Sequence, residues 1–346
     1  MIKKVTINDV ARKAGVAKST VSRTFAEGES VSEATRKRVL RVAEELGYEP
    51  NPLAKALSVS STKIIAIVVP NTESIHISQV TRGVISTLSK AGYSVVTVDS
   101  SENFGEQTNI HKPLSNQLVD GIINCYSSAA EEIKILSSKK PVVCVGDRPE
   151  GYDADFVGVD YLQGYRMLCD YIKNQGYKHL CLVNGQEDEN ARRMSGLFKK
   201  AASAYGLVIS DEDIFYANWT PNSGYQAMQK ILKKNRPDVV VCASDMVAFG
   251  AIKAAHNNGL DVPKDIAICG MDDSMISKYT IPSLTTLKFS PFKLGAQAAK
   301  MILNRLENGG EPKEMILPVN VAKRNSITKE HDLSEDPFDY SKGEEK

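Results

Sequence analysis

From Lys63 onward, short apolar runs alternate with stretches of helical periodicity, and this alternation constrains the fold more than any other feature of the chain. The runs are KIIAIVVP, YSVVTVD, DGIINCY, PVVCVGD, FVGVD, HLCLVNG, IFYAN, DVVVCASD and IAICGMDD. Runs this continuously apolar are typical of strands buried on both faces, and the helices between them predict parallel βαβ units. Nine or more strands exceed one comfortable open sheet, so the pattern predicts an α/β fold with two doubly wound lobes.

The first fifty residues follow a different pattern, which predicts three short helices. Thr6 is placed to cap a first helix that Gly15 ends, and a second helix is predicted over residues 18–25. Ser32 is placed to cap a third helix, which Gly47 ends. A helix, a tight turn, a second helix and a supporting helix make the helix-turn-helix layout.

Charge is distributed unevenly along the chain. Residues 1–60 hold 11 Lys and Arg against 7 Asp and Glu, whereas the remainder holds 32 against 35. A positive excess confined to one end indicates a module that binds a polyanion, fused to a domain with another task. Taken alone the charge is a weak signal, because many solvated helices are basic.

The composition is that of a globular protein, with 42% hydrophobic and 25% charged residues. No apolar run approaches the roughly 20 residues that span a bilayer, and the first residues lack a secretory signal, so we expect a cytoplasmic protein without a membrane partner. The six cysteines never stand in C-x-x-C spacing, and we interpret them as reduced, buried side chains rather than zinc ligands or disulfides. No cofactor and no metal are predicted.

Several motifs together resemble one protein family. They are VTINDVARKAGVAKSTVSRTF near the start, then VSEATRKRV, LGYEPNPLAKAL, DGII, SDMVAFGAI and IPSLTTL. With these motifs the chain resembles the lactose/galactose-repressor (LacI/GalR) family of bacterial transcription regulators over nearly its whole length. The resemblance implies a three-helix helix-turn-helix head and a two-lobed, periplasmic-binding-protein-like domain of doubly wound parallel sheets.

The resemblance and the composition predict four segments. Residues 1–50 are the DNA-binding domain, 51–61 the hinge, 62–327 the effector-binding and dimerisation domain, and 328–346 a tail. The tail is acidic and has no apolar period, which is typical of a disordered segment. It also lacks the leucine heptads that would build a tetramerisation bundle, so we expect a homodimer.

The resemblance assigns base reading to the second helix. It places base contacts at Lys18, Ser19 and Arg23 and a phosphate contact near Thr20, and Arg23 suits bidentate pairing with guanine. The alternatives are that Lys18 is only a solvated charge and that Val21 belongs to the core. The residues predicted to contact DNA are Thr6, Lys18, Ser19, Thr20, Ser22, Arg23, Asn51, Ala54 and Leu57.

Two positions depart from the family pattern. Ala17 stands where a serine usually caps the recognition helix, a loss that typically costs about 1 kcal/mol, and Ala26 stands where asparagine is common. The resemblance also implies that the segment NPLAKALS becomes a hinge helix on operator DNA, where Leu57 wedges between base pairs of the minor groove. The alternative is a rigid connector with incidental leucines.

The resemblance places an effector between the two lobes, at the carboxyl ends of the strands. The predicted lining residues are His76, Ile77, Asp147, Arg148, Arg193, Trp219, Asp245 and Asp272. Trp219 could stack on the apolar face of a sugar, and Arg193 and Asp272 match the polar effector ligands of the family. The alternatives are that Asp245 caps the following helix and that His76 serves packing or lies on the surface.

The sequence therefore predicts a homodimeric repressor of carbohydrate-catabolism genes that binds a pseudo-palindromic operator. Its effector is predicted to be a small sugar, or more sharply an anionic sugar acid, because arginines near the predicted site match a carboxylate. A purine-responsive or activating regulator of the same family is the alternative. An enzyme and a free sugar receptor are remote alternatives, since we find no P-loop, G-x-G-x-x-G, H-E-x-x-H or G-x-S-x-G pattern.

Overall fold

The computed structural model describes residues 5–25, 31–48, 61–70, 72–100, 119–125, 137–146, 154–234 and 236–328. Outside these ranges lie the predicted DNA contacts Asn51, Ala54 and Leu57, the predicted effector contacts Asp147 and Arg148, Ala26, and residues 329–346 of the predicted tail. The chain divides into two compact units, Met1–Ile64 with Gln117–Asp120, and Ile65–Asn116 with Gly121–Lys346. Each unit is described by itself.

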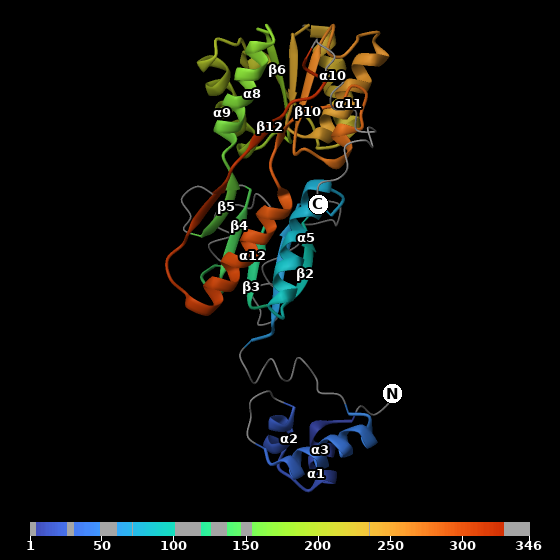
Figure 1. The fold of residues 1–346 in the computed structure, drawn as a ribbon, viewed down its shortest axis with the longest axis vertical. Helices are drawn as coiled ribbons and strands as arrows, with labels where there is room; N and C mark the ends of the chain where they lie inside the picture. Colours follow the sequence, from blue (N-terminus) through green and yellow to red (C-terminus); the bar gives the residue numbers. More distant parts are fainter. Residues whose placement is uncertain are drawn as a thin grey trace, which may run out of the picture. The chain divides into compact units, whose positions relative to one another are not determined.

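The three predicted helices of the first unit are confirmed. They are α1 (Ile7–Ala14), α2 (Lys18–Thr24) and α3 (Glu33–Leu46). Gly15 and Gly47 end α1 and α3 with φ angles of 63° and 62°, in the left-handed region that glycine adopts without steric cost. The core between the helices consists of Val10, Ala11, Ala14, Val21, Val39, Val42 and Ala43. Small apolar side chains at helical spacing thus hold together the three helices, whose ribbons are grouped in Figure 1.

Lobe 1 of the second unit is built on a six-stranded sheet in the order β11-β5-β4-β3-β1-β2, and the strand pairs from β11 to β1 are all parallel. Its strands are β1 (Ile64–Val69), β2 (Ser94–Asp99), β3 (Gly121–Asn124), β4 (Val142–Val145), β5 (Asp155–Val159) and β11 (Glu314–Leu317). The helices α5 (Ile75–Lys90) and α12 (Pro291–Asn308) pack side by side against it (Figure 1).

Lobe 2 has a six-stranded sheet in the order β12-β10-β9-β8-β6-β7. Its strands are β6 (Leu180–Asn184), β7 (Ile214–Tyr216), β8 (Val239–Cys242), β9 (Ala267–Met271), β10 (Thr285–Lys288) and β12 (Asn320–Ala322). Its helices are α8 (Tyr161–Asn174), α9 (Glu189–Ala204), α10 (Pro221–Lys234) and α11 (Asp245–Asn257), with two short 3-10 helices, η2 (Asp211–Asp213) and η3 (Met275–Lys278). Only β12 runs antiparallel to its neighbour among the strand pairs that the structure describes.

The chain passes between the two sheets three times. It leaves lobe 1 after β5, returns after β10 into α12, and leaves again after β11 to form β12. Three short crossings therefore connect the lobes, and residues on these crossings lie at the junction of the two sheets.

Helices approach each other closely in both lobes because glycines stand at the crossing points. A Cβ atom added at Gly83 of α5 would lie 2.1 Å from the carbonyl oxygen of Phe292 in α12. One added at Gly250 of α11 would lie 1.8 Å from the carbonyl oxygen of Pro221 in α10. Any larger residue at either position would push the helix pair apart.

The predicted α/β fold and all nine predicted strands are confirmed, with two differences. Three short strands, β10, β11 and β12, were not predicted, since their residues are more polar and carry no long apolar run. The prediction that all nine runs are buried on both faces is wrong for β2, where Val96 is 47% exposed, and for β7, none of whose three residues is buried. The reason is that β2 and β7 are each the last strand of a sheet, which sequence periodicity does not reveal.

Candidate functional site

The exposed face of α2 carries the residues predicted to read DNA bases. Lys18, Ser19, Ser22 and Arg23 are exposed, whereas Val21 is fully buried. Positions 18 and 22, like 19 and 23, are four residues apart, so their side chains share one face of the helix. Two cations and two hydroxyl groups on one helical face suit contacts with base edges and phosphates.

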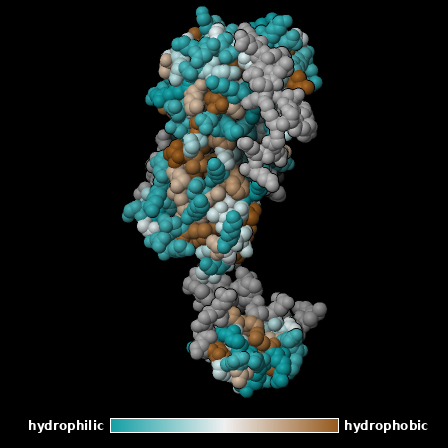
Figure 2. All heavy atoms as spheres, in the orientation of Figure 1, coloured by the Kyte–Doolittle hydropathy of each residue, from teal (hydrophilic) through white to brown (hydrophobic). Residues whose placement is uncertain are grey.

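The opposite face of α2 attaches the helix to the rest of the unit. The Arg36 guanidinium of α3 donates to the carbonyl of Thr24 (2.8 Å) and so ties the two helices together, whereas the Thr24 hydroxyl donates within α2 to the carbonyl of Thr20 (2.9 Å). Thr20 itself is half-buried. At the start of the helix, Ala17 is the N-cap and makes no side-chain hydrogen bond, as its sequence predicts. The face of the first unit that Figure 2 shows is mainly hydrophilic.

Thr6 belongs to the cap of α1. Its hydroxyl and its backbone N–H donate to the Asp9 carboxylate at 2.6 and 3.0 Å. These hydrogen bonds lower the pKa of Asp9. The Thr6 hydroxyl therefore organises the helix start, and any contact with DNA would be made from that fixed position.

Two successive aspartates after β9 adopt left-handed backbone angles. φ is 110° at Asp272 and 50° at Asp273, where side chains other than glycine are uncommon. The hydrogen bonds that hold this turn run from Asp272 N–H to Leu287 O (2.9 Å), from Asp273 N–H to Thr286 Oγ1 (3.3 Å) and from Ser274 N–H to Asp245 Oδ2 (2.7 Å). Strain of this kind, held in place by neighbouring groups, concentrates at functional sites.

The turn brings Asp272 of lobe 2 to His76 of lobe 1. His76 Nδ1 lies 3.2 Å from Asp272 Oδ1, although the two residues are 196 positions apart. Both side chains keep some exposure, 26% for His76 and 20% for Asp272. The His76 ring also contacts the Phe289 ring edge-to-face, with centroids 5.7 Å apart. Two predicted effector residues from different lobes thus meet beside an aromatic side chain.

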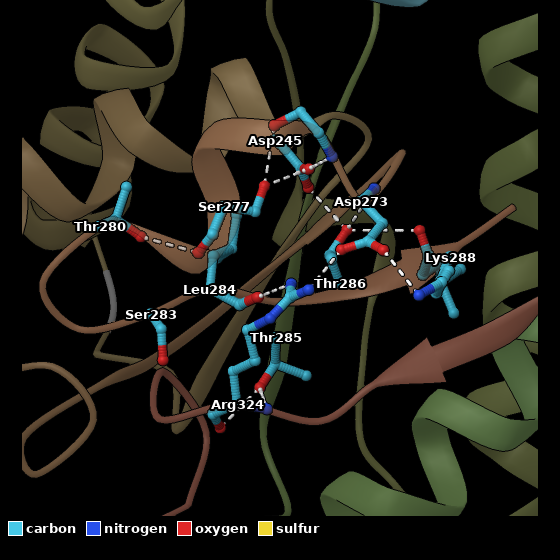
Figure 3. Close-up of polar contacts among 12 residues, drawn as sticks. Asp245, Asp273, Ser277, Thr280, Ser283, Leu284, Thr285, Thr286, Lys288 and Arg324 are labelled. Atoms are coloured by element: carbon cyan, nitrogen blue, oxygen red, sulfur yellow. Dashed lines mark hydrogen bonds and ion pairs between the residues drawn. The ribbon is translucent and has the colours of Figure 1, made fainter. Parts of the chain in front are cut away.

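Asp245, by contrast, is an interior residue. It is 1% exposed, and its carboxylate accepts hydrogen bonds from the Thr286 hydroxyl (2.6 Å), the Ser277 hydroxyl (2.5 Å) and the Ser274 N–H (2.7 Å). Figure 3 shows the two hydroxyl groups pointing at the carboxylate. A ligand cannot reach these oxygens in this arrangement, so we withdraw Asp245 from the predicted effector contacts.

The alternative prediction, that Asp245 caps α11, is also wrong. Ser244 is the N-cap, and its hydroxyl accepts from the Val247 N–H at 3.3 Å. Burial, together with the nearby charge of Asp272, raises the pKa of Asp245 to about 7, against the opposing effect of its hydrogen bonds. Asp245 therefore links η3 to β10 inside lobe 2.

Asp273 is neutralised within lobe 2. Its Oδ1 accepts from Arg324 Nη2 at 2.5 Å, its Oδ2 lies 3.3 Å from Lys288 Nζ, and Arg324 also donates to the carbonyl of Leu284 (Figure 3). Because two cations already pair with its carboxylate, Asp273 stabilises the turn and is not directed at the other lobe. Asp272 is the carboxylate of this turn that faces the other lobe.

Trp219 lies at the carboxyl end of β6. Its φ is 59°, and a Cβ atom added at Gly185 would lie 2.0 Å from its indole ring, so the ring covers the backbone just after the strand. Trp219 remains 46% exposed. A flat, half-exposed indole beside a strand end is a surface on which a ring-shaped ligand can stack.

The remaining predicted effector residues lie in two different settings. Arg193 is exposed on α9, and its Nη2 donates to Asn190 Oδ1 at 2.8 Å. Ile77 packs into the core of lobe 1 and lines a groove between α5 and β2 instead of facing Asp272. Adjacent residues of a helix point in directions about 100° apart, which separates Ile77 from His76. We therefore do not place Ile77 in the site.

Sequence reasoning missed the aromatic residues on the crossings. Phe289 contacts both His76 and, with ring centroids 6.3 Å apart, Tyr161. Tyr161 follows β5 and Phe289 follows β10, so each lies on a connection between the lobes. The available signal was their position directly after a strand, but β10 was itself not predicted.

Neither a metal cluster nor a membrane span stands out in the part of the chain that the structure describes. Among those residues, no group of three or more His, Cys, Asp or Glu side chains could hold an ion. No described helix is both long and apolar enough to cross a membrane. Five of the six cysteines are buried, as predicted, and burial raises the pKa of the Cys144 and Cys169 thiols to about 12.

Comparisons with known proteins agree with this architecture. Residues 6–51 match the family described as "Bacterial regulatory proteins, lacI family", and residues 169–327 match the periplasmic binding protein-like domain. The catabolite control protein A of Priestia megaterium is 30% identical over 306 residues, which cover 86% of this chain and 91% of that protein. The chain belongs to the LacI family. The matched head coincides with α1, α2 and α3.

Two further LacI-family comparisons bear on activity. The transcriptional repressor PurR of Pasteurella multocida is 30% identical and covers 90% of this chain and 95% of its own length. The Lac repressor dimer bound to operator and the anti-inducer ONPF is 26% identical, with a TM-score of 0.83 over 94% of this chain and all of that chain. This LacI-family chain is accordingly a DNA-binding transcription repressor and not an enzyme.

Proposed function

We propose that the protein represses carbohydrate-catabolism genes by placing α2 of two subunits in the major groove of a pseudo-palindromic operator. The exposed face formed by Lys18, Ser19, Ser22 and Arg23 supports this assignment, because it joins groups for base edges and phosphates on one short helix. The bacterial chromosome as a partner implies a cytoplasmic location. The segments 1–50, 51–61, 62–327 and 328–346 remain the proposed functional divisions.

Replacement of Arg23 tests the base-reading proposal. Arg23→Ala should weaken binding to the operator selected by the wild-type protein from random duplexes by about tenfold or more, and relax one base position. Arg12→Ala removes an exposed arginine from α1 and is the matched control, with operator affinity expected to stay close to wild type. Equal losses in both variants would mean that only net charge matters.

The effector proposal rests on one observation, the approach of Asp272 to His76 between the lobes. A strained turn holds the partly exposed carboxylate of Asp272 there, and carboxylate oxygens accept hydrogen bonds from sugar hydroxyls. Trp219 supplies a half-exposed flat ring at the end of β6. Strands β6 and β9 flank β8, so these two groups belong to strand ends about 10 Å apart, a span that suits a small sugar.

The charge at the site decides between a neutral sugar and a sugar acid. Arg193 is exposed on α9, whereas Asp273 is already paired with Arg324 and Asp245 is buried. Asp245 and Asp273 are thus engaged elsewhere and do not neutralise an arginine of the site, which favours the sugar acid. A purine effector is the second candidate, because the PurR protein of Pasteurella multocida is a 30% identical relative and the half-exposed indole of Trp219 is a flat surface on which a base could stack.

A titration followed by tryptophan fluorescence separates these candidates, because Trp219 is the sole tryptophan. Hexuronates, keto-deoxy sugar acids, neutral hexoses and purines are added to the full chain, and Asp272→Asn is titrated alongside. The proposal expects a response to sugar acids that Asp272→Asn weakens. A response to neutral sugars alone would reject the acid, and one to purines alone would reject the sugar.

The homodimer proposal rests on exposed apolar side chains around η3 in lobe 2. Met275, Ile276, Tyr279 and Ile281 are exposed, Ile281 to 89%. Monomers rarely leave four large apolar side chains exposed within seven residues, and a second copy of the chain would cover them. Ile281→Asp should shift the protein toward monomer in light scattering, whereas Val208→Asp, at an exposed apolar residue elsewhere in lobe 2, should leave the dimer intact.

A further inference from the structure

The three residues that lead into β1 are all bound by one carboxylate. Asp120 accepts hydrogen bonds from the Ser61 hydroxyl (2.6 Å), the Thr62 N–H (2.7 Å), the Thr62 hydroxyl (2.8 Å) and the Lys63 N–H (2.9 Å). Its own N–H donates to the carbonyl of Ile64 at 2.8 Å. Asp120 thus binds the residues just before β1 through its carboxylate and the first residue of β1 through its backbone N–H.

Lys63 adopts a conformation that it would not choose without this contact. Its φ is 54°, in the left-handed region, which costs an L-residue about 1 kcal/mol or more. The Asp120 carboxylate binds the N–H of this residue and that of the preceding Thr62. Two backbone hydrogen bonds to one rigid acceptor select a single path for residues 61–63.

The charge state of Asp120 suits a permanent contact. Burial by itself would raise the pKa of Asp120, but the four hydrogen bonds from Ser61, Thr62 and Lys63 outweigh it and lower the pKa. The carboxylate therefore stays ionised, and an ionised acceptor holds N–H and O–H donors about twice as strongly as a neutral one.

This contact lies on the segment of chain between the DNA-binding helices and β1. Ser61, Thr62 and Lys63 are the last three residues of the connection from α3 to β1, and Asp120 directly precedes β3, the neighbour of β1 in the sheet. We propose that Asp120 is a positioning residue, which fixes the direction in which the chain leaves lobe 1 and thereby restricts where α2 of each subunit can reach on the operator.

This inference rests on the proposed dimeric operator binding and makes a prediction of its own. Two heads on fixed joints accept one separation of half-sites, because inserting a base pair shifts one half-site by about 3.4 Å and rotates it around the duplex. Heads on flexible joints accept several separations of half-sites. Their affinity for the best separation is lower, because the joints lose conformational freedom on binding.

The first experiment measures hydrogen exchange of single backbone amides in the full chain. In Asp120→Asn the Thr62 and Lys63 amides should exchange about tenfold faster or more than in the wild type. Asp99→Asn is the matched control, because Asp99 also accepts a backbone N–H and a hydroxyl, both from Thr72. Unchanged exchange at Thr62 and Lys63 in Asp120→Asn would overturn the proposal.

The second experiment measures affinity for the selected operator and for versions with one base pair added or removed between half-sites. Wild type and Asp99→Asn should lose about tenfold or more on either change. Asp120→Asn should bind all three duplexes within about threefold, with an unchanged dimer state and a melting temperature lowered by only a few degrees. A preserved spacing preference in Asp120→Asn would overturn the inference alone. A wild-type protein without any spacing preference would overturn the proposed dimeric operator binding as well.

Discussion

Asp120 and Asp245 each accept three or more hydrogen bonds from protein groups, yet their pKa values shift in opposite directions. Asp120 lies at the partly exposed start of β1 and β3, and its pKa is lowered. Asp245 lies inside lobe 2, and its pKa is raised to about 7. The donors are of the same kinds, namely backbone N–H and hydroxyl groups, so the donors do not explain the difference.

The surroundings of the two carboxylates explain it. Asp245 is removed from water and faces a second negative charge, that of Asp272, both of which oppose ionisation. Asp120 keeps partial contact with solvent, and although burial is the largest single influence on its pKa, the four hydrogen bonds together outweigh it. Asp120 therefore stabilises the fold in its ionised form, whereas ionisation of Asp245 lowers the stability of the fold.

The largest effect is expected from removing the interior carboxyl group. Asp245→Ala leaves the Ser277 and Thr286 hydroxyls and the Ser274 N–H without their acceptor, and should lower the free energy of unfolding by about 4 kcal/mol. In Asp120→Ala the donors that bind Asp120 can hydrogen-bond to water instead, so the free energy of unfolding should fall by about 1 kcal/mol or less. Urea titrations of both variants measure this, and equal losses would remove the distinction between the two sites.

The second effect is the pH dependence that Asp245 contributes. Because its folded-state pKa is raised, the folded protein binds this proton more tightly, and the associated stability is present at acidic pH and lost as pH rises towards 7. Between pH 5 and pH 8 the free energy of unfolding of the wild type should fall relative to Asp245→Asn by about 2 kcal/mol. Parallel pH profiles for the two proteins would show that Asp245 does not titrate in this range.

Asp120 should show the opposite sign with a smaller size. Its pKa is lowered in the folded protein, so its contribution to stability is fully present above the ordinary aspartate pKa of 3.8 and is lost as the pH falls from there through the lowered folded-state pKa. The stability advantage of the wild type over Asp120→Asn should therefore shrink as the pH falls below about 4, by less than about 1 kcal/mol because solvent screens the site. An advantage that grows on acidification would contradict the assigned direction.

The smallest effect concerns the backbone at the joint. Lys63→Gly should raise the free energy of unfolding by about 0.5 kcal/mol, because relief of the left-handed strain exceeds the added freedom of the unfolded chain. Lys300→Gly, in the interior of α12, is the control and should cost about 1 kcal/mol. Thermal unfolding resolves the two signs, and a loss at Lys63 similar to that at Lys300 would show that φ at this joint carries no strain.

The sequence alone determined the local features of this protein. The caps at Thr6, Ser32 and the two helix-ending glycines act within one helical turn, and each was predictable from its neighbours. The nine apolar strands and the exposed face of α2 follow from periodicity over five to eight residues, for the same reason. In these cases the deciding interactions join residues close together in the chain.

Only the tertiary structure decided which polar residues face a ligand and which face the interior. Asp245 and Asp272 both follow apolar strands and look equivalent in the sequence, but segments more than twenty residues away bury one and leave the other beside His76. The contact of Asp120 with residues 61–63 spans nearly sixty positions in the same way. Burial and pKa depend on what the fold packs around a side chain, and that set of neighbours is assembled from distant parts of the chain.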